Sequence, residues 1–562
     1  MLNAVPTELW WSCYLINLLW VFIMENSTLK DFPLDFFYSD ITNWSKEISG
    51  SHILTCVPEN ETELLAAINW AYANNYCARP VGMKHNWSPL TIANGNNNGN
   101  VLLIDLSSKI NKVTIEKDGE NGYVTAQTGV SMQELLTLLE KNKLGFYATP
   151  APGDLTLGGV LAIGGHGTCI SADGETPSEF GNYGSVSNSI CALNAIVWNS
   201  ESTQYELHEF KRDDPDISAF LVHVGRAFIY EVTLQVPRNR RLRCQSFVNI
   251  PATELFSIEG SSQRTFSHFL DQCGRAEAIW FPFTKNPWLK IWTIEDKYPS
   301  VSKPTNGPFN YPFSDNLPVQ ISDIIKKINN GFPELTPTLG QTQMELVSIG
   351  LGATISTDLW GWSKDLLLYV KPTTLRVTAN GYAIITKRSN IQKVLHEFVE
   401  KYESMVDEYK NVNSFPMNGP IEIRVTGLDR PQQSVVANAV APDLSPVAPV
   451  EGKPDWDTAI WLDILTMPDT PDANKFYSEM EKWIYSHYSG DYATVRVEWS
   501  KGWGYTESSA WADKQVISQD VPNSFGANSA ENDRWQHAHD ILRKYDPHYV
   551  FSSPLLDMLF EK

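Results

Sequence analysis

RPVGMKHNWS at residues 79–88 and GGVLAIGGHGT at residues 158–168 are the two stretches that decide the expected fold. Each is a glycine-containing turn, and a helix-like segment lies between them. Glycine lets backbone N–H groups approach a ligand without an intervening Cβ. Two such turns about one small domain apart predict a cradle for an extended, phosphate-bearing cofactor. The alternative is two tight loops that hold no ligand.

The elements around the turns argue against two common nucleotide motifs. Neither turn is a P-loop, because no Gly-Lys-Ser/Thr follows it, and no GxGxxG lies between the strand and helix of one βαβ unit. Capping-box patterns at Asn60–Glu63 and Ser131–Glu134 predict helices over 61–75 and 132–141. The expected strands are 53–57, 78–81, 101–105, 113–116, 123–127, 189–199, 229–236, 421–426 and 494–499, with further helices over 390–410 and 534–544.

Composition places the chain among folded globular proteins. Its 562 residues, 42% hydrophobic and 19% charged, favour two or more domains. A net charge of -21 argues against a nucleic-acid partner. The seven Cys form no CxxC pair, so neither a metal site nor a disulfide scaffold is expected. The 19 Trp, 22 Tyr and 24 Phe are enough to build a flat apolar pocket.

Changes in composition divide the chain into four parts. An apolar segment, 1–30, precedes a first domain over 31–237, which ends at the basic run PRNRR. A region rich in Trp, Pro and Phe covers 238–500, and 501–562 is expected to return to the first domain. The expected fold class is α+β with two domains, of which the second has a mixed or antiparallel sheet with helices.

The N-terminal segment is the part of the sequence that bears on localisation. Residues 9–24, LWWSCYLINLLWVFIM, are nearly all apolar but shorter than the ~20 residues that span a bilayer. Three interpretations remain: an atypical export signal, an interfacial anchor, or residues upstream of a start at Met24. Export ranks first, so a secreted or cell-envelope location is expected. Without a signal the protein would be cytoplasmic.

The turns and the elements around them resemble the FAD-binding domain of the vanillyl-alcohol-oxidase-type (PCMH-type) flavoproteins, over residues 45–237. That family attaches its flavin in an Arg-Pro-x-Gly-x-x-His loop, so the resemblance implies a covalent link from His85 to the flavin 8α-methyl. No Cys lies between Cys77 and Cys169, which implies a single link. Strand 230–236 is also implied to contact FAD. The remaining implied cofactor residues are Pro80, Gly82, Asn86, Gly158, Gly159, Gly164, Gly165, His166, Gly167 and Gly184.

The residues alone leave the roles of the two histidines open. His85 is either a nucleophilic imidazole placed against a cofactor or an ordinary loop histidine. His166 either hydrogen-bonds the cofactor or caps its own turn.

The rest of the chain resembles the covalent-flavin (type II) cholesterol oxidases. The similar segments are AEAIWFPFTKNPWLK at 276–290, IEIRVTGLD at 421–429 and DPHYVFSSPLLD at 546–557. This resemblance implies that Glu277, Glu422 and Arg424 belong to the active site, and Glu498 is a further candidate.

The carboxylates also make chemical sense without the resemblance. Glu422 and Arg424 are two apart on a strand and project to one face, although a surface ion pair is the alternative. Glu277 lies in an apolar run, where burial is expected to raise its pKa and suit it to act as a general base. The alternative for Glu277 is a surface position on an edge strand.

The resemblance implies an FAD-dependent oxidase of a sterol 3β-hydroxyl that uses dioxygen and releases hydrogen peroxide. Isomerisation of the 5-ene-3-one to the 4-ene-3-one would follow, and a peripheral membrane contact would give access to sterol. One alternative is a flavin oxidase or dehydrogenase of a sugar lactone or another alcohol, which the aromatic middle region argues against. The other is a non-catalytic lipid-binding protein, against which the intact loop around His85 weighs.

Overall fold

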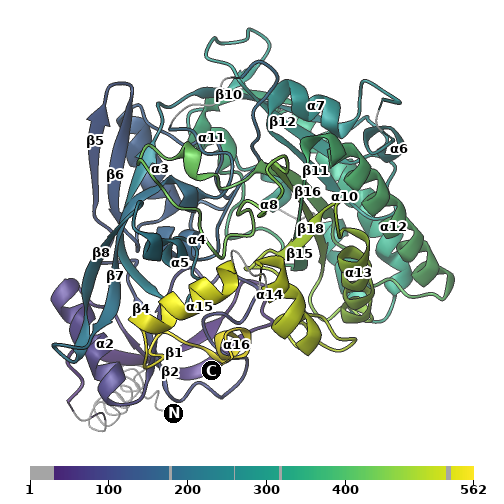
Figure 1. Cartoon of the computed structure of the whole chain (residues 1–562). Coiled ribbons are helices and arrows are strands. Elements are labelled where there is room, and N and C mark those ends of the chain that lie inside the picture. The colour runs from purple at the N-terminus through teal and green to yellow at the C-terminus, as the bar shows by residue number, and fades with distance from the viewer. Residues whose placement is uncertain are drawn as a thin grey trace, which may run out of the picture.

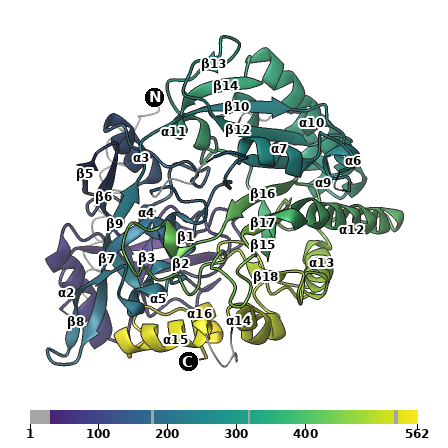
Figure 2. The ribbon, with the colours of Figure 1, turned by 45° about the horizontal axis from the view of Figure 1, so that its top comes forward.

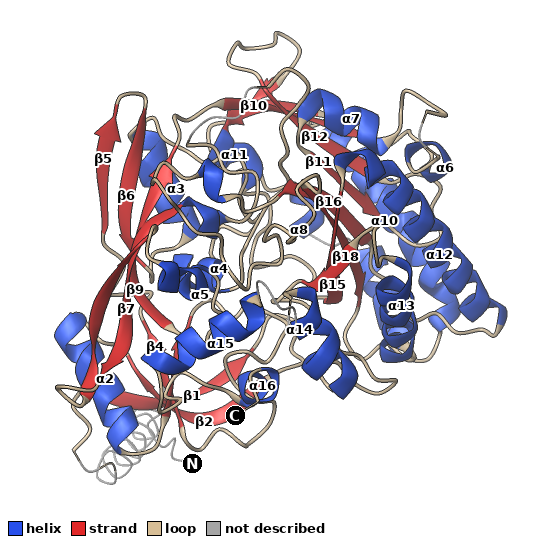
Figure 3. Ribbon diagram, in the orientation of Figure 1, coloured by secondary structure: helices blue, strands red, loops and turns tan. Residues whose placement is uncertain are grey.

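The structure is a computed structural model that describes residues 29, 31–175, 180–258, 260–315, 319–526 and 533–561. It contains three β-sheets with helices packed against them (Figures 1 and 3). Two sheets are built from residues 36–236, which we call the N-terminal lobe, and the third from 241–497. The predicted two-domain α+β fold is confirmed. The apolar segment 9–24 lies outside the described residues, so the cellular location stays a prediction.

The first sheet of the N-terminal lobe carries the first glycine turn at its edge. Its strand order is β1-β2-β4-β3, with β1 antiparallel and the other three strands parallel. The apolar run of β4 lies inside the sheet, where Leu102 and Ile104 are fully buried. Asn60 caps α2 as predicted, since its side chain accepts from the N–H of Glu63. The bounds are β1 Phe36–Thr42, β2 Ser49–Cys56, α2 Glu61–Ala73, β3 Cys77–Val81 and β4 Val101–Asp105.

The second sheet is antiparallel and supports the second glycine turn. Its order is β5-β6-β9-β7-β8, and the predicted hairpin forms β5 and β6. The predicted capping box at Ser131 and Glu134 starts α3. The bounds are β5 Val113–Asp118, β6 Asn121–Gln127, α3 Met132–Lys141, α4 Leu157–Ala162, β7 Ile190–Asn199, β8 Gln204–Lys211, α5 Ser218–Leu221 and β9 Phe228–Val236.

The third sheet has nine strands in the order β13-β14-β10-β12-β11-β16-β17-β15-β18. Neighbouring strands are antiparallel except β13 and β14. The bounds are β10 Arg241–Phe247, β11 Ala276–Trp280, β12 Trp288–Ile294, β13 Lys303–Pro304, β14 Asp358–Trp362, β15 Thr378–Thr386, β16 Ile421–Gly427, β17 Thr458–Thr466 and β18 Thr494–Val497.

The two faces of the third sheet have different partners. Helices α7 (Phe266–Cys273), α12 (Ile391–Asn411) and α13 (Ala473–His487) lie on its outer side (Figure 2). Because side chains alternate along a strand, Ala278 and Ile423 pack in the same core as α12. Their neighbours Glu277, Ile279, Glu422 and Arg424 line a cavity instead. We call the face that carries these neighbours the inner face.

Further helices complete the two ends of the molecule. Residues of α10 share a core with Trp288 and Trp292 of β12. After the third sheet the chain packs on the N-terminal lobe, where Val550 and Phe551 join the core around β4. No helix among the described residues is long and apolar enough to cross a membrane. The bounds are α6 Ala252–Leu255, α8 Pro312–Asp315, α9 Val319–Asn329, α10 Thr336–Ala353, α11 Ser363–Leu367, α14 Val521–Ser524, α15 Arg534–Tyr545 and α16 Pro554–Leu559.

Candidate active site

A cavity of about 510 Å³ extends from the two glycine turns to the inner face of the third sheet. The loop after β3 and the loop around α4 form its N-terminal wall, and α9, α10 and the segment 367–377 contribute to the rest of its lining. Its volume is typical of a site for a small organic ligand.

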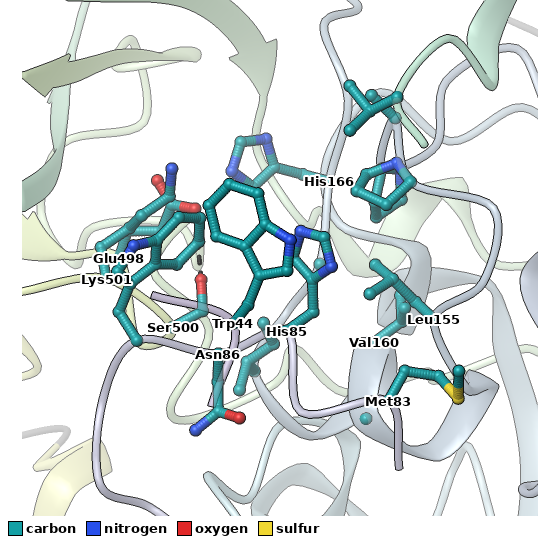
Figure 4. Close-up of a pocket in the computed structure, with 18 of the residues that line it drawn as sticks. Trp44, Met83, His85, Asn86, Leu155, Val160, His166, Glu498, Ser500 and Lys501 are labelled. Atoms are coloured by element: carbon teal, nitrogen blue, oxygen red, sulfur yellow. Dashed lines mark hydrogen bonds between the residues drawn. The ribbon is translucent and has the colours of Figure 1, made fainter. Parts of the chain in front are cut away.

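His85 lies on the first wall of the cavity, in the loop that follows β3. Its ring stacks on Trp44, with centroids 5.0 Å apart (Figure 4), and lies nearly perpendicular to the ring of Trp87. Burial, with a smaller contribution from the charges of Lys501 and Arg376, lowers the pKa of His85 to about 4. The imidazole is therefore neutral at neutral pH and keeps a lone pair free for bonding.

His166 lies on the second wall, in the loop after α4. Gly164 opens this loop with a φ of 66°, a left-handed conformation that favours glycine. The Nδ1 of His166 is 2.9 Å from its neighbour's carbonyl, Gly167 O, so His166 does close its own turn. Burial above all lowers its pKa to about 3, and the ring also stacks on Trp461 of β17.

The two loops present unused hydrogen-bond donors to the cavity. No described residue accepts a hydrogen bond from the backbone N–H groups of residues 83–86, 159 or 166–168, all of which line the cavity. The buried Thr149 Oγ1 on the same wall also lacks a partner in the described part of the chain. A free backbone N–H at the wall of a cavity can bind an anionic acceptor, and the pyrophosphate of a dinucleotide supplies such acceptors. The residues present therefore fit FAD.

Ten of the eleven residues that the family resemblance assigned to the cofactor line this cavity. They are Pro80, Gly82, His85, Asn86, Gly158, Gly159, Gly164, Gly165, His166 and Gly167. Gly184 does not line it: a Cβ there would stand 2.1 Å from Asp429 Oδ1, so this glycine accommodates a buried side chain. Strand 230–236 also lies outside the lining, which includes Ile229 and His223 instead.

The inner face aligns charged residues across neighbouring strands. Glu277 of β11 pairs with Arg424 of β16 in the strand register. Glu422 of β16 pairs with Asp463 of β17, which in turn pairs with Gly381 of β15. Two adjacent rows of the sheet therefore bring these residues, distant in sequence, to one place.

Arg424 is the centre of this cluster. Its guanidinium lies 3.2 Å from Glu277 Oε1 and 3.0 Å from Glu422 Oε2, and it also pairs with Asp463. Burial acts to lower its pKa, but the three carboxylates raise it well above the usual value. The predicted proximity of Glu422 and Arg424 is confirmed, and their ion pair lines a cavity rather than the outer surface.

The expectation that burial raises the pKa of Glu277 was wrong. Its carboxylate is 1% exposed, but Lys290 Nζ lies 2.7 Å away and Tyr369 donates a hydrogen bond at 2.8 Å. Burial acts to raise the pKa, and the charges of Lys290 and Arg424 overcome it, so the pKa lies below its usual value. β11 also lies inside the sheet, between β12 and β16, and not at an edge.

Sequence reasoning missed several residues of the cavity wall and of the charged cluster behind it. Lys290 is fully buried, and its ammonium lies 3.3 Å from the ring centroid of Tyr369, with Trp288, Trp292 and Tyr311 also nearby. Asp463 and Lys501 complete the cluster, with Lys501 Nζ 3.4 Å from Asp463 Oδ2. A charged residue inside an apolar strand, as in WLKIWTI and TAIWLDILT, was a usable signal. Tyr369 follows a short helix and carried no such signal.

The aromatic side of the cavity is the part expected to hold an apolar ligand. It is formed by side chains of β11, β12 and the helices that follow, together with Tyr311 and Phe313. Among the described residues, no group of three or more His, Cys, Asp or Glu is arranged to hold a metal ion. The apolar lining residues are Ile279, Phe281, Trp288, Trp292, Tyr311, Phe313, Ile321, Leu346, Val347 and Leu367.

Comparison with known families agrees with this geometry. A family model described as an FAD-binding domain matches residues 53–179, and one described as cholesterol oxidase, substrate-binding, matches residues 241–561. Fold and site together define a two-domain FAD-dependent oxidoreductase. Because the second model covers more than half of the chain, the chain belongs to the cholesterol oxidase family.

Solved structures of that family match along nearly the whole chain. A solvent-stable cholesterol oxidase is 51% identical with a TM-score of 0.93, covering 94% of this chain and 99% of that one. A cholesterol oxidase from Brevibacterium sterolicum is 40% identical with a TM-score of 0.92, covering 95% and 99%. The L-gulonolactone oxidase of Mus musculus is 25% identical over 260 residues. That match covers 46% of this chain and about half, 52%, of the relative.

Proposed function

We propose that this protein oxidises the 3β-hydroxyl of a sterol to the ketone with FAD as the electron acceptor, and that dioxygen takes the electrons to give hydrogen peroxide. The observation that carries this proposal is the continuity of one cavity. Unused backbone donors line one end of the cavity, and aromatic side chains line the other. Arg424 and its partners Glu277 and Glu422 also line this cavity. Bound FAD supplies the redox chemistry by accepting a hydride.

His85 is the proposed point of attachment of the cofactor. The neutral imidazole is stacked against Trp44, which holds the ring in one orientation. A low pKa keeps the ring nitrogens from being protonated at neutral pH. This supports a covalent bond from His85 to the flavin, as in the family whose attachment loop the sequence resembles.

The carboxylates of the cavity are proposed to handle protons. Glu422, whose side chain is 22% exposed, is the better base because it is paired with one cation. Glu277 is 1% exposed and bound by both Lys290 and Arg424, so it holds a proton poorly and acts mainly to fix those cations. Arg424 would stabilise the alkoxide as the hydroxyl loses its proton.

The same geometry supports a second step. After oxidation, the carbonyl makes the C4 hydrogens acidic, and a carboxylate above one face of the steroid can carry a proton from C4 to C6. Glu422 meets this requirement because its side chain faces the cavity. Arg424 beside it would stabilise the enolate, and the product is the conjugated 4-ene-3-one.

The lining of the cavity favours a sterol over a sugar lactone. A sugar presents a hydroxyl group on most of its carbons and needs polar partners for them. The side chains that β11, β12 and α10 contribute to the cavity wall include the apolar Ile279, Trp292 and Val347. A flat hydrocarbon skeleton fits such walls.

Access to a lipid surface is part of this proposal. Helix α10 contributes Leu346 and Val347 to the cavity. On the same helix Ile349 is 69% exposed, and Ile355, just after it, is 72% exposed. Two large exposed apolar side chains, on and just after a helix that lines the cavity, support a peripheral contact with the membrane that holds the sterol.

The function is tested by aerobic incubation of the purified protein with detergent-dispersed cholesterol. Hydrogen peroxide and the ultraviolet band of a conjugated enone are followed together. We expect both signals. Peroxide without the enone would remove the isomerisation, and neither signal from a yellow protein would contradict sterol oxidation and direct the search to sugar lactones and other alcohols.

A further inference from the structure

We propose that Asp463 and Glu498 share one proton and form a carboxyl pair that exchanges it with the cavity through Glu498. Asp463 is then a positioning residue, because it is fully buried and does not line the cavity. The kinetic part of this inference rests on the proposed function, whereas the shared proton itself does not.

The first observation is a pair of buried oxygens without donors. Asp463 Oδ1 and Glu498 Oε2 are both buried, and no donor in the described part of the chain bonds to either. Both lie 2.9 Å from the position that a Cβ on Gly381 would occupy, and the two side chains are in hydrogen-bonding contact. Two acceptors that face each other in a buried place repel unless a proton lies between them.

The strand register explains why these side chains meet. Asp463 of β17 lies opposite Gly381 of β15. On the other side, the N–H of Glu498 donates to the carbonyl of Gly381 at 3.0 Å. Because residue 381 is glycine, no side chain fills the space between the carboxyl groups of Asp463 and Glu498. A Cβ at this position would also stand 2.8 Å from Lys501 Cγ. The absence of a side chain at 381 is therefore what permits the contact.

The second observation is the charge of the surrounding cluster. Asp463 faces Arg424 and Glu422 from β16 and Lys501 from the turn after β18, and His166 lies near it in neutral form. Gly381 on β15 adds no charge. Beyond Arg424 lies the pair of Glu277 with Lys290. The cluster thus combines four carboxyl groups with three cations.

One additional proton makes this buried cluster neutral. An uncompensated charge in a buried site is costly, so a proton is expected to remain on the buried carboxyl oxygens that no donor reaches. Asp463 Oδ2 is paired with Arg424 and Lys501, and within the described part of the chain Glu498 Oε1 accepts only from Ser500, at 3.4 Å. The two oxygens left over are Oδ1 and Oε2, which face each other.

The titration behaviour of Asp463 agrees with this placement. Burial and the negative charge of Glu498 raise the pKa of Asp463 to about 6, although Lys501 and Arg424 act in the opposite direction. Two coupled carboxyls titrate as a unit. The pair therefore holds its proton at a pH below about 6 and releases it to the cavity at a higher pH. The only bond that changes is O–H.

Infrared difference spectra of the holoenzyme test the shared proton without any substrate. We expect the wild-type protein at a pH below 6 to show the carbonyl band of a protonated carboxyl that is lost in both Asp463→Asn and Glu498→Gln. Each substitution keeps the side-chain shape and supplies an N–H donor in place of the proton. Glu403→Gln is the matched control, because Glu403 on α12 also has a raised pKa but lies outside the cavity.

The outcome is decisive in either direction. Loss of the same band in both variants, with the band retained in Glu403→Gln, supports sharing. A band that survives in either of the two variants, or that is absent from the wild type, overturns it. These infrared results do not depend on whether the protein oxidises sterols, because the test uses no substrate.

Kinetics then test the positioning role. For the wild type we expect the kcat for cholesterol to change with pH. The midpoint of that change should match the pH at which half of the infrared carbonyl band is lost. Both variants should lose this dependence, and Asp463→Asn should lower kcat and leave KM unchanged. A pH profile of Asp463→Asn identical to that of wild type would overturn the role.

Discussion

His166 stacks on Trp461, with ring centroids 3.6 Å apart and ring planes inclined by 11°. The contact joins the second glycine loop of the N-terminal lobe to the inner face of the third sheet. Trp461 is fully buried and also donates from Nε1 to Thr426 Oγ1 at 3.0 Å. One side chain therefore links the cofactor-side loop to the strands that carry the charged cluster.

Replacing Trp461 tests this link. Trp461→Ala should cost about 3–5 kcal/mol of unfolding free energy, as expected for a buried aromatic residue. Trp461→Phe keeps a ring against His166 and loses the hydrogen bond, which should cost only about 1–2 kcal/mol. Denaturant unfolding of the holoenzyme measures both losses, and the absorption spectrum of the bound flavin reports whether the loop that carries His166 still holds the cofactor. Equal losses in the two variants would contradict a role for the stacking.

The attachment of the cofactor is tested at His85. His85→Ala removes the only side chain proposed to bond the flavin, so acid precipitation should release all of the flavin from this variant. Flavin should stay with the precipitate in the wild type and in the control His208→Ala, a change at an exposed position on β8. Flavin that stays with precipitated His85→Ala would contradict the covalent link.

The buried pair of Glu277 and Lys290 predicts strong coupling. Lys290→Met leaves the carboxylate of Glu277 with one cation fewer, which should cost about 3–5 kcal/mol, as for other broken buried pairs. The double variant Lys290→Met/Glu277→Gln removes the buried charge as well and should recover much of that loss. A double-mutant cycle by denaturant unfolding measures the coupling, and additive losses would contradict it.

The lowered pKa of Glu277 sets the direction in which the stability of the protein changes with pH. The folded-state pKa of Glu277 lies below its usual value of 4.5. Its contribution to stability is therefore present above that value and is lost as the pH falls through the lowered folded pKa. In Glu277→Gln the loss of stability on acidification should be smaller than in the wild type.

Local patterns in the sequence predicted much of this structure. The capping residues Asn60 and Ser131 marked the starts of α2 and α3, and alternation on β16 placed Glu422 and Arg424 on one face. The partners of these residues could not be predicted in the same way. Strand register sets the contact of Arg424 with Asp463, and register depends on the whole sheet.

The misjudged pKa of Glu277 has the same origin. An apolar run in the sequence indicates that Glu277 is buried. It does not indicate which charged side chains of neighbouring strands contact Glu277. Lys290 reaches Glu277 because β11 pairs with β12, and Arg424 reaches it because β11 pairs with β16. Gly184 shows the converse case, in which a glycine interpreted as a ligand contact makes room for Asp429.

Arg424 should contribute to turnover more than to cofactor binding. Arg424→Ala removes the cation that is proposed to stabilise the alkoxide, and loss of one such donor costs about 10²–10³ in kcat. The spectrum of the bound flavin should change little, because the glycine loops hold the cofactor. Arg424→Lys should recover part of the rate. Stopped-flow reduction of the flavin by cholesterol measures this step, and an unchanged rate in Arg424→Ala would remove Arg424 from the site.

The exposed side chains of Ile349 on α10 and of Ile355 just after it predict where the protein contacts a lipid surface. Burying one Ile side chain contributes about 1.5–3 kcal/mol, so Ile349→Asp/Ile355→Asp should weaken binding to cholesterol-containing phosphatidylcholine vesicles by at least about tenfold. Sedimentation with vesicles measures the binding. The rate on detergent-dispersed cholesterol should remain that of the wild type, because neither side chain lines the cavity. Val412→Asp is the control, since Val412 is 76% exposed and follows α12 on the outer side of the third sheet. Equal vesicle binding by the double variant and by Val412→Asp would contradict a lipid contact at α10.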